Sequence, residues 1–324
     1  MRAAFGFGFG LPLGDSGDAP AIDWNFAGGV LPSALTFSRA SLATMYDAAG
    51  TLVTASSGSP RLTYDPVTHA ALGLLVEEQR TNLLLNSLLD GTNLSTQSVT
   101  VAATQYTLSF YGTGQIVLSG SATATVVGTG AFPTQKTYTF TPSAGSLTLT
   151  VTGTVQFAQL EAGAFATSYI PTGAASATRA ADVVTCTGAA FSSWFNGTEG
   201  TLLDEFACAA MSNYPSGASL NGCGWNDNST QALWWDGVAN TATPSTVAVG
   251  QARRQVVAWD AAGYSISANG STPTTVTGRQ PWPSARSALQ LGGIGSIQYI
   301  NGPIKRVRYW RKRLTNAQLQ ALTA

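Results

Sequence analysis

Residues 105–120, QYTLSFYGTGQIVLSG, contain two short runs in which apolar residues alternate with small polar ones. The side chains of a β-strand point alternately to its two faces, so each run offers one face to a core and the other to water. The same pattern recurs in the surrounding chain, in SVTVAA, ATATVVG, KTYTFTP, SLTLTVTG and VQFAQLEAG. Regularly spaced short strands of this kind predict a small antiparallel β-sandwich over residues 87–175.

Outward from this module, composition divides the chain into four further parts. Residues 1–22 form a Phe- and Gly-rich arm, and an extended arm would place the rings of Phe5, Phe7 and Phe9 on one face. We expect these three rings to anchor the chain on another surface. Residues 23–86 read as a β-rich attachment region with frequent turns, and residues 176–188 as a linker.

Residues 189–324 predict a second, larger β-sandwich, because segments such as RRQVVAWDA and IKRVRYW are rich in strand-forming residues. At the end of the chain Thr315 is placed to cap a short helix that carries Leu319 and Leu322. The predicted fold class is therefore all-β, with an N-terminal docking arm, two sandwiches and one short terminal helix.

Charge and cysteine content restrict the function. Charged residues make up 10% of the chain and the formal net charge is zero, which argues against a nucleic-acid binder. Three cysteines, Cys186, Cys208 and Cys223, are an odd number and exclude a full disulfide framework. His69 is the only histidine and its segment predicts a surface turn, so we expect neither a zinc site nor another cofactor. Arg2 precedes apolar residues, but Pro12 interrupts them, so we expect no export signal and no membrane insertion.

Isolated carboxylates are the next candidates for chemistry. Glu161 lies alone among apolar residues, where it is either a general acid with a raised pKa or a structural acceptor at a strand end. Since no Asp or Glu lies between Asp90 and Glu161, the structural role is favoured. The neighbours Glu77, Glu78 and Arg80 similarly predict a salt-bridged corner. We therefore expect no catalytic residues and no enzyme.

Glycan binding is the sharper positive hypothesis. Six of the eight tryptophans follow residue 220, and the segment GCGWNDNSTQALWWDG combines three indoles with polar side chains. Sugar rings stack on indole while amides and carboxylates hold the hydroxyls. The alternative is that most of the rings fill the sandwich core, with Trp259 and Trp310 buried. Oxygens of this segment also suit Ca²⁺, although their spacing lacks the order of an EF-hand. The candidate glycan-binding residues are Trp225, Asn226, Asp227, Trp234, Trp235 and Asp236.

Basic residues cluster near the end of the chain, where no Asp or Glu follows Asp260. This cluster fits an anionic-glycan patch, protection of an edge strand, or a subunit contact. Its members are Lys305, Arg306, Arg308, Arg311, Lys312 and Arg313.

Three stretches together resemble a family of tailed-phage and prophage virion proteins, the head spike or fibre and tail-fibre proteins with carbohydrate-binding-module-like domains. They are LTFSRASLATMYDAAGTLVTA, PRLTYDPVTHAALGLLVEEQRTNLLLNS and FAQLEAGAFATSYIPTGAASATRAADVV, and the resemblance covers roughly residues 30–185. The last region, ending in NGPIKRVRYWRKRLTNAQLQAL, resembles a concanavalin A-like (laminin G-like) lectin sandwich.

The resemblance implies a homotrimeric structural protein on the virion surface, made in the bacterial cytoplasm and released by lysis. Its implied partners are capsid or tail proteins and a host-surface glycan bound by the C-terminal domain, and the small sandwich is implied to be a jelly roll. Family members often carry a longer, Trp-bearing segment after NLLLNS, and its lack here argues against a glycan site in the middle module. The alternatives are a virion-associated glycan depolymerase and a purely structural stabiliser without ligand.

Overall fold

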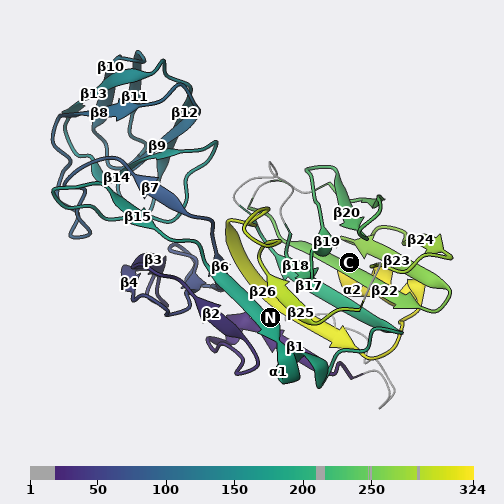
Figure 1. Ribbon diagram of the computed structural model, residues 1–324. Coiled ribbons are helices and arrows are strands. Elements are labelled where there is room, and N and C mark those ends of the chain that lie inside the picture. Colours follow the sequence, from purple (N-terminus) through teal and green to yellow (C-terminus); the bar gives the residue numbers. More distant parts are fainter. Residues whose placement is uncertain (1–18, 209–215, 247, 249, 283–284) are drawn as a thin grey trace, which may run out of the picture.

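The computed structural model describes residues 19–208, 216–246, 248, 250–282 and 285–324. In this part of the chain the regular structure is almost entirely β, and it forms two lobes (Figure 1). We call the larger lobe the main sandwich and the smaller one the inserted sandwich. The predicted all-β class with a short C-terminal helix is confirmed. The anchoring residues Phe5, Phe7 and Phe9 lie outside the described residues.

The main sandwich consists of two facing sheets. The first sheet contains, in spatial order, β24 (Thr274–Thr277), β23 (Gly263–Ala268), β22 (Arg253–Asp260), β17 (Gly200–Phe206), β26 (Gly302–Trp310), β6 (Ala71–Val76) and β5 (Leu62–Tyr64), with β1 (Ile22–Asn25) also paired to β26. The second contains β2 (Thr36–Ser38), β16 (Val183–Thr187), β25 (Ala288–Leu291), β18 (Ala218–Leu220), β19 (Cys223–Trp225), β20 (Gln231–Trp235) and β21 (Asn240–Pro244).

Aromatic side chains dominate the core between these sheets. Trp225, Trp234, Trp259, Tyr264 and Tyr309 have no exposed surface and belong to one continuous cluster. Burial of rings of this size is the main source of stability for such a sandwich.

The two ends of the chain build the main sandwich together. Strands β1, β2, β5 and β6 lie within residues 22–76, almost entirely in the predicted attachment region of residues 23–86, and each pairs within the main sandwich. The inserted sandwich therefore interrupts a domain that begins before it and ends after it. A boundary at residue 189 does not separate the sheets, because β16 pairs with β25 and β6 pairs with β26 across it.

The inserted sandwich packs a four-stranded sheet on a three-stranded one. The first contains β11 (Ala124–Val127), β10 (Gln115–Gly120), β13 (Gly145–Thr152) and β8 (Gln97–Val101), and the second β12 (Lys136–Phe140), β9 (Tyr106–Tyr111) and β14 (Gln156–Ala162). The chain enters through β7 (Arg80–Asn82) and leaves through β15 (Ala177–Arg179), and these two strands pair with each other.

The predicted alternation holds along β10, where Ile116 and Leu118 are buried in the core of the inserted sandwich. It fails along β9, which is buried on both faces. The reason is that Thr107 donates its hydroxyl to the carbonyl of Gly163, so the chain after β14 covers the second face.

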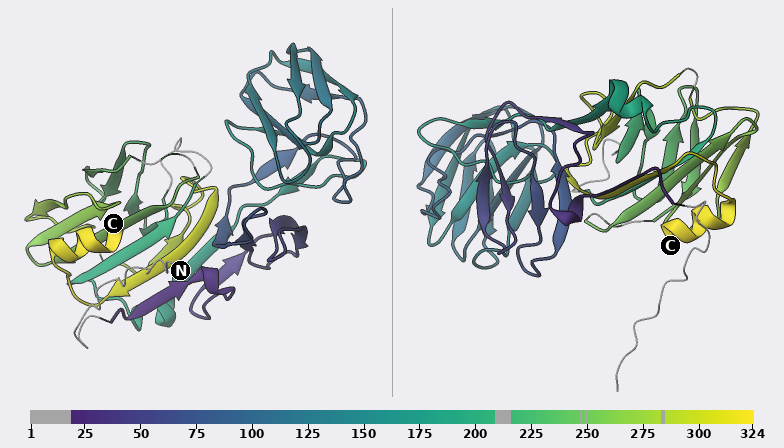
Figure 2. Two further views of the ribbon diagram at one scale, coloured as in Figure 1. Left: turned by 180° about the vertical axis from the view of Figure 1, so that it is seen from behind. Right: turned by 90° about the horizontal axis from the view of Figure 1, so that it is seen from below.

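Short elements complete the structure. They are the hairpin β3 (Ala43–Tyr46) and β4 (Leu52–Ala55), the 3₁₀ helix η1 (Phe26–Gly28), and the helices α1 (Gly188–Ser192) and α2 (Asn316–Thr323). Thr315 and Gln318 form a reciprocal capping box that starts α2, which confirms the predicted cap. Leu319 packs α2 onto the outer side of the first sheet (Figure 2).

The remaining expectations concern single residues and the membrane. His69 is exposed at the turn after β5. Cys186, Cys208 and Cys223 are buried and form no disulfide bond. Among the described residues no helix has the length and apolar character that crossing a membrane requires.

Candidate functional site

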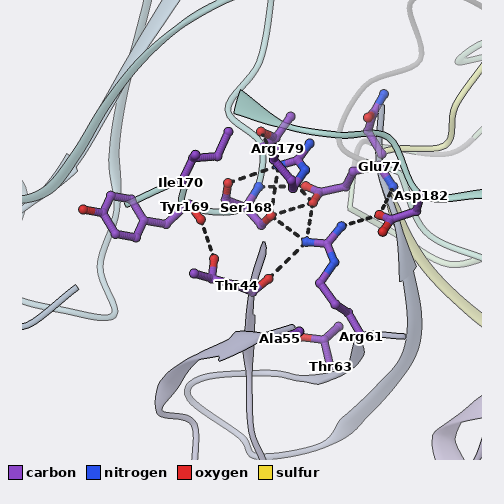
Figure 3. A network of polar contacts seen from close by, with 12 residues as sticks. Thr44, Ala55, Arg61, Thr63, Glu77, Ser168, Tyr169, Ile170, Arg179 and Asp182 are labelled. Carbon is purple, nitrogen blue, oxygen red and sulfur yellow. Dashed lines mark hydrogen bonds and ion pairs between the residues drawn. The ribbon is translucent and has the colours of Figure 1, made fainter. Parts of the chain in front are cut away.

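A buried ion-pair cluster lies where the inserted sandwich leaves the main one (Figure 3). We call this group the junction cluster: Arg39, Arg61, Glu77, Arg179 and Asp182. Asp182 accepts from Arg39 at 3.1 Å and also from Arg61, and Glu77 lies 2.7 Å from Arg61 and 3.3 Å from Arg179. The five residues come from the chain on both sides of the insertion, so the cluster ties its root to the main sandwich.

Glu77 is held ionised by its neighbours. Burial alone would raise its pKa, but Arg179, Arg61 and hydrogen bonds from Ser168 outweigh burial and lower the pKa to about 2. Ser168 donates its backbone N–H at 2.7 Å and its hydroxyl at 2.6 Å to the two Glu77 oxygens. A carboxylate with this many donors is structural, and the prediction of a salt-bridged corner is confirmed.

Glu161 has the structural role that its position predicted. Its carboxylate is fully buried and accepts the Thr167 backbone N–H at 2.5 Å and the Thr167 hydroxyl at 2.7 Å. Burial raises the pKa of Glu161, and the two Thr167 hydrogen bonds partly offset this effect. The carboxylate thus fixes the turn that follows β14.

Two of the three indoles predicted to stack on a sugar fill the core instead. Trp225 and Trp234 have no exposed surface, and their rings meet edge to face at 5.2 Å. Trp225 donates its indole N–H to Asp204 at 3.0 Å, and Trp234 donates to the carbonyl of Pro281 at 3.0 Å. Because neither ring has a free face, the prediction is wrong for both tryptophans.

The two aspartates of the predicted site accept hydrogen bonds from nearby backbone N–H groups and so fix the local loops. Asp236 is buried and accepts from the Tyr264 hydroxyl at 2.8 Å and from two backbone N–H groups, and it forms an ion pair with Arg279 at 2.7 Å. Asp227 is buried and accepts from the Leu233 backbone N–H at 3.2 Å. Asn226 and Trp235 alone among the six are partly exposed, so the structure does not bring the predicted glycan site together.

Two further expectations about this region have structural answers. Trp259 and Trp310 are buried, as predicted. In the ranges that the structure describes, no three His, Cys, Asp or Glu side chains are grouped so that they could hold a metal ion.

Asp204 and Asp227 face one cation, Arg253, inside the main sandwich, and we call the two carboxyls the core acid pair. Burial and then the neighbouring Asp227 charge raise the pKa of Asp204 well above its ordinary value. Burial likewise raises the pKa of Asp227 to about 7, although Arg253 lies 3.5 Å away. One positive charge is too little to keep two desolvated carboxylates ionised.

An open cleft of about 490 Å³ lies beside the junction cluster, at the root of the inserted sandwich. We call it the seam cleft. The ion pair of Glu78 and Arg80, 2.5 Å apart, supplies its charged groups, with 25% and 10% of the two side chains exposed. The residues lining the cleft are Glu78, Gln79, Arg80, Thr81, Leu83, Tyr106, Ala162 and Gly163.

Local contacts fix the charged groups of the cleft. The Arg80 guanidinium lies over the Phe165 ring at 4.9 Å, and Gly163 gives it room, since a Cβ there would come within 1.7 Å of Arg80 Nη1. Asn301 accepts the Glu78 backbone N–H at 2.9 Å, and Arg179 donates to the Glu78 carbonyl at 2.6 Å. The junction cluster therefore also positions the seam cleft.

The ion pair in this cleft was predicted from the sequence, whereas the cleft itself was not. Glu78 and Arg80 are close in the chain, whereas the opposite wall is formed by Tyr106 and Gly163 of the inserted sandwich. The clearest sequence signal was the glycine at position 163, placed where the chain turns after a strand.

Comparisons with known proteins yield partial likenesses among solved structures. No known family and no curated protein matches the chain. Trypanosoma rangeli sialidase aligns with 44% of this chain and 25% of its own, at 16% identity and a TM-score of 0.36. The chain thus spans about a quarter of that sialidase.

Two smaller domains align over more of their own length. The CBM40 of Ruminococcus gnavus IT-sialidase, bound to alpha2,3 sialyllactose, aligns with 39% of this chain and 83% of its own, at 18% identity and a TM-score of 0.31. Domain 4 of AbnA, a GH43 extracellular arabinanase from Geobacillus stearothermophilus in complex with arabinotriose, aligns with 50% and 82%, at 12% identity and a TM-score of 0.36. Similarity at this level carries no evidence of a shared function. What the fold and the site define is a two-lobed β-sandwich protein with a polar cleft at its seam.

Proposed function

We propose that this protein binds a glycan in the seam cleft and is displayed on the surface of a phage virion. The observation that carries the proposal is the cleft itself. Its volume of about 490 Å³ lies within the range of small-molecule sites and accommodates one or two sugar rings. Glu78 offers acceptors and Arg80 offers donors for sugar hydroxyls, while Leu83 and Tyr106 supply apolar surface.

Binding rather than hydrolysis fits the charged groups of the cleft. Glycosidases commonly use two carboxyl groups on either side of the scissile bond. Among the described residues that line the cleft, Glu78 is the one carboxylate, and it is paired with Arg80. A depolymerase remains the competing hypothesis, and release of reducing ends from host polysaccharide by the purified protein would establish it.

Display on a virion rests on the sequence resemblance over residues 30–185 and on the charge-poor strands. In this proposal the arm of residues 1–22 anchors a homotrimer to capsid or tail proteins, and the host-surface glycan meets the exposed lobes. Deleting residues 1–14 should abolish incorporation into particles while the purified protein keeps its thermal unfolding transition. Normal incorporation of the truncated protein would contradict the anchor.

The glycan site is tested with a panel of immobilised oligosaccharides and two matched variants. Glu78→Gln removes a charged acceptor from the cleft and should weaken binding of the selected glycan about 10- to 100-fold. Asp90→Asn makes the same change of charge at an exposed loop of the inserted sandwich and should leave binding unchanged.

A third variant, Trp235→Ala, examines the half-buried ring of β20. If Trp235→Ala removes binding and Glu78→Gln does not, the site lies on the main sandwich and the seam cleft is wrong. If the wild-type protein binds no member of the panel, the purely structural role gains support instead.

A further inference from the structure

The outer face of the first sheet carries a second concentration of charge, away from the seam cleft. Along β26, Val307 and Tyr309 point into the core, so Arg306 and Arg308, which alternate with them, point outward. The strands beside β26 add further charged side chains at neighbouring register positions. We call this surface the basic face: Asp23, Glu205, Arg254, Lys305, Arg306 and Arg308.

Two carboxylates serve three of the four cations of the basic face. Asp23 accepts two hydrogen bonds from Arg306, at 2.7 Å and 2.5 Å. Glu205 lies 3.4 Å from Lys305 and 3.6 Å from Arg254. The face therefore keeps an excess of two positive charges, although the chain as a whole is neutral.

Arg308 is the cation left over. Its guanidinium lies 5.4 Å from the centre of the Trp310 ring, and among the described residues it forms no ion pair with a carboxylate. Burial and then the nearby Arg306 charge lower the pKa of Arg308. By contrast, the buried guanidinium groups of Arg61, Arg179 and Arg253 all meet carboxylates. An anion placed against Arg308 would supply what the chain provides elsewhere.

Protection of a sheet edge does not explain these cations. β26 is an interior strand, paired with β17 on one side and with β1 and β6 on the other, so it has no open edge to protect. Helix α2 packs on the adjoining part of this side of the sheet, against Leu203 and Val256 (Figure 2). The Lys305 and Arg306 side chains are 52% and 35% exposed.

Other cations of the C-terminal cluster have separate roles. Arg311 donates to the carbonyls of Ser193 and Trp194, and Arg313 pairs with Asp260 at 3.4 Å. Arg311 and Arg313 thus have contacts of their own outside the basic face.

We propose that the basic face binds an acidic polysaccharide, with uronic-acid carboxylates lying against Arg308 and Lys305. A flat, partly exposed sheet surface suits an extended polymer, and a carboxylate matches the guanidinium geometry of Arg308. This site is independent of the seam cleft, which offers a paired carboxylate and a smaller, concave volume.

The test measures binding of the full chain to immobilised polygalacturonate, with dextran as the neutral comparator, between about 20 mM and 300 mM NaCl. The wild-type protein should bind polygalacturonate and not dextran, and the affinity should fall as salt screens the charges. Arg308→Gln and Lys305→Gln should each weaken binding about tenfold. Lys136→Gln, the same change of charge on the inserted sandwich, should change it less than twofold.

Three results would overturn the proposal: no binding by the wild-type protein at the lowest salt, equal binding to dextran, or an equal loss in Lys136→Gln. Sedimentation of the same variants separates the other candidate occupant, a second copy of this chain. If Arg308→Gln dissociates an oligomer and leaves polymer binding intact, the face is a subunit contact. Thermal unfolding of each variant, which should match the wild type within a few degrees, shows that the fold is retained.

Discussion

The junction cluster and the core acid pair are both buried, yet the pKa of a carboxyl group is lowered in the first and raised in the second. Three guanidinium groups surround two carboxylates in the junction cluster, and the pKa of Glu77 falls to about 2. One guanidinium group faces two carboxyls in the core, and the pKa of Asp227 rises to about 7. Burial is common to both, so the balance of charges decides the protonation state.

The difference matches the positions of the two groups. The junction cluster joins segments from both sides of the insertion and keeps the charged walls of the seam cleft in place. The core acid pair lies inside one sandwich, where Asp204 accepts from Trp225 and Gln255. The junction cluster connects the two lobes through ion pairs, whereas the core acid pair is a polar group within an aromatic core.

The largest loss of stability is expected from breaking the ion pairs of the junction cluster. Asp182→Asn leaves Arg39 and Arg61 facing one carboxylate fewer, and loss of one partner from a buried ion pair costs about 3–5 kcal/mol. Urea unfolding should therefore show a lower free energy of unfolding by that amount. Glu199→Gln, at an exposed position, is the control and should stay within about 0.5 kcal/mol. A cost below about 1 kcal/mol for Asp182→Asn would show that the cluster does not hold the lobes.

The next effect is a pH dependence of opposite sign for the two groups. The folded-state pKa of Glu77 is depressed, so its contribution to stability is present above about pH 4.5 and is lost as the pH falls toward 2. The folded-state pKa of Asp227 is raised, so its contribution is present below about pH 4 and is lost as the pH rises toward 7. Over each of these pH ranges the free energy of unfolding should change by about 3–4 kcal/mol.

Two variants show which carboxyl group causes each pH-dependent change in stability. Asp227→Asn imitates the protonated carboxyl, so it should leave stability at pH 4 unchanged and exceed the wild type at pH 8. Glu77→Gln should flatten the pH dependence of stability below pH 4.5. The free energy of unfolding by urea, measured from pH 2 to 8, distinguishes these outcomes. If Asp227→Asn destabilises the protein equally at every pH, the acid pair is ionised and this assignment fails.

A smaller effect is expected where the core acid pair meets the aromatic core. Trp225→Phe keeps most of the ring volume and removes the indole N–H that Asp204 accepts at 3.0 Å. The buried acceptor left unpaired should cost about 1–3 kcal/mol. Loss of this donor should also raise the pKa of Asp204 further, which carboxyl NMR titration can follow. An unchanged stability together with an unchanged titration would remove Trp225 from the pair.

The smallest effect on stability is expected at the partly exposed ion pair of the seam cleft. Glu78→Gln breaks a partly exposed pair with Arg80, and such pairs contribute about 0.2–1 kcal/mol. The same variant should weaken glycan binding about 10- to 100-fold, so this position affects binding much more than stability. If Glu78→Gln lowers the free energy of unfolding by more than about 3 kcal/mol, Glu78 instead belongs to the junction cluster.

Local patterns in the sequence predicted the elements and some single residues. The alternation in β10, the cap at Thr315 and the acceptor role of Glu161 all depend on neighbours within a few positions. The pairing of Glu78 with Arg80 is local in the same sense.

Contacts between distant segments could not be predicted in this way. β1 pairs with β26 across almost the whole chain, and Arg61 meets Asp182 far along the sequence. The tryptophans near residue 230 carry the same composition whether they line a sugar site or fill a core. Their burial was decided by the facing sheet, which includes strands from the first part of the chain.

The central claim is that the seam cleft holds a glycan, and a crystal structure of the protein with the glycan selected from the panel tests it most directly. We expect ordered sugar between β7 and the inserted sandwich, with hydroxyls within hydrogen-bond distance of Glu78 and Arg80. Sugar bound beside Trp235 on the main sandwich, with the seam cleft empty, would contradict it.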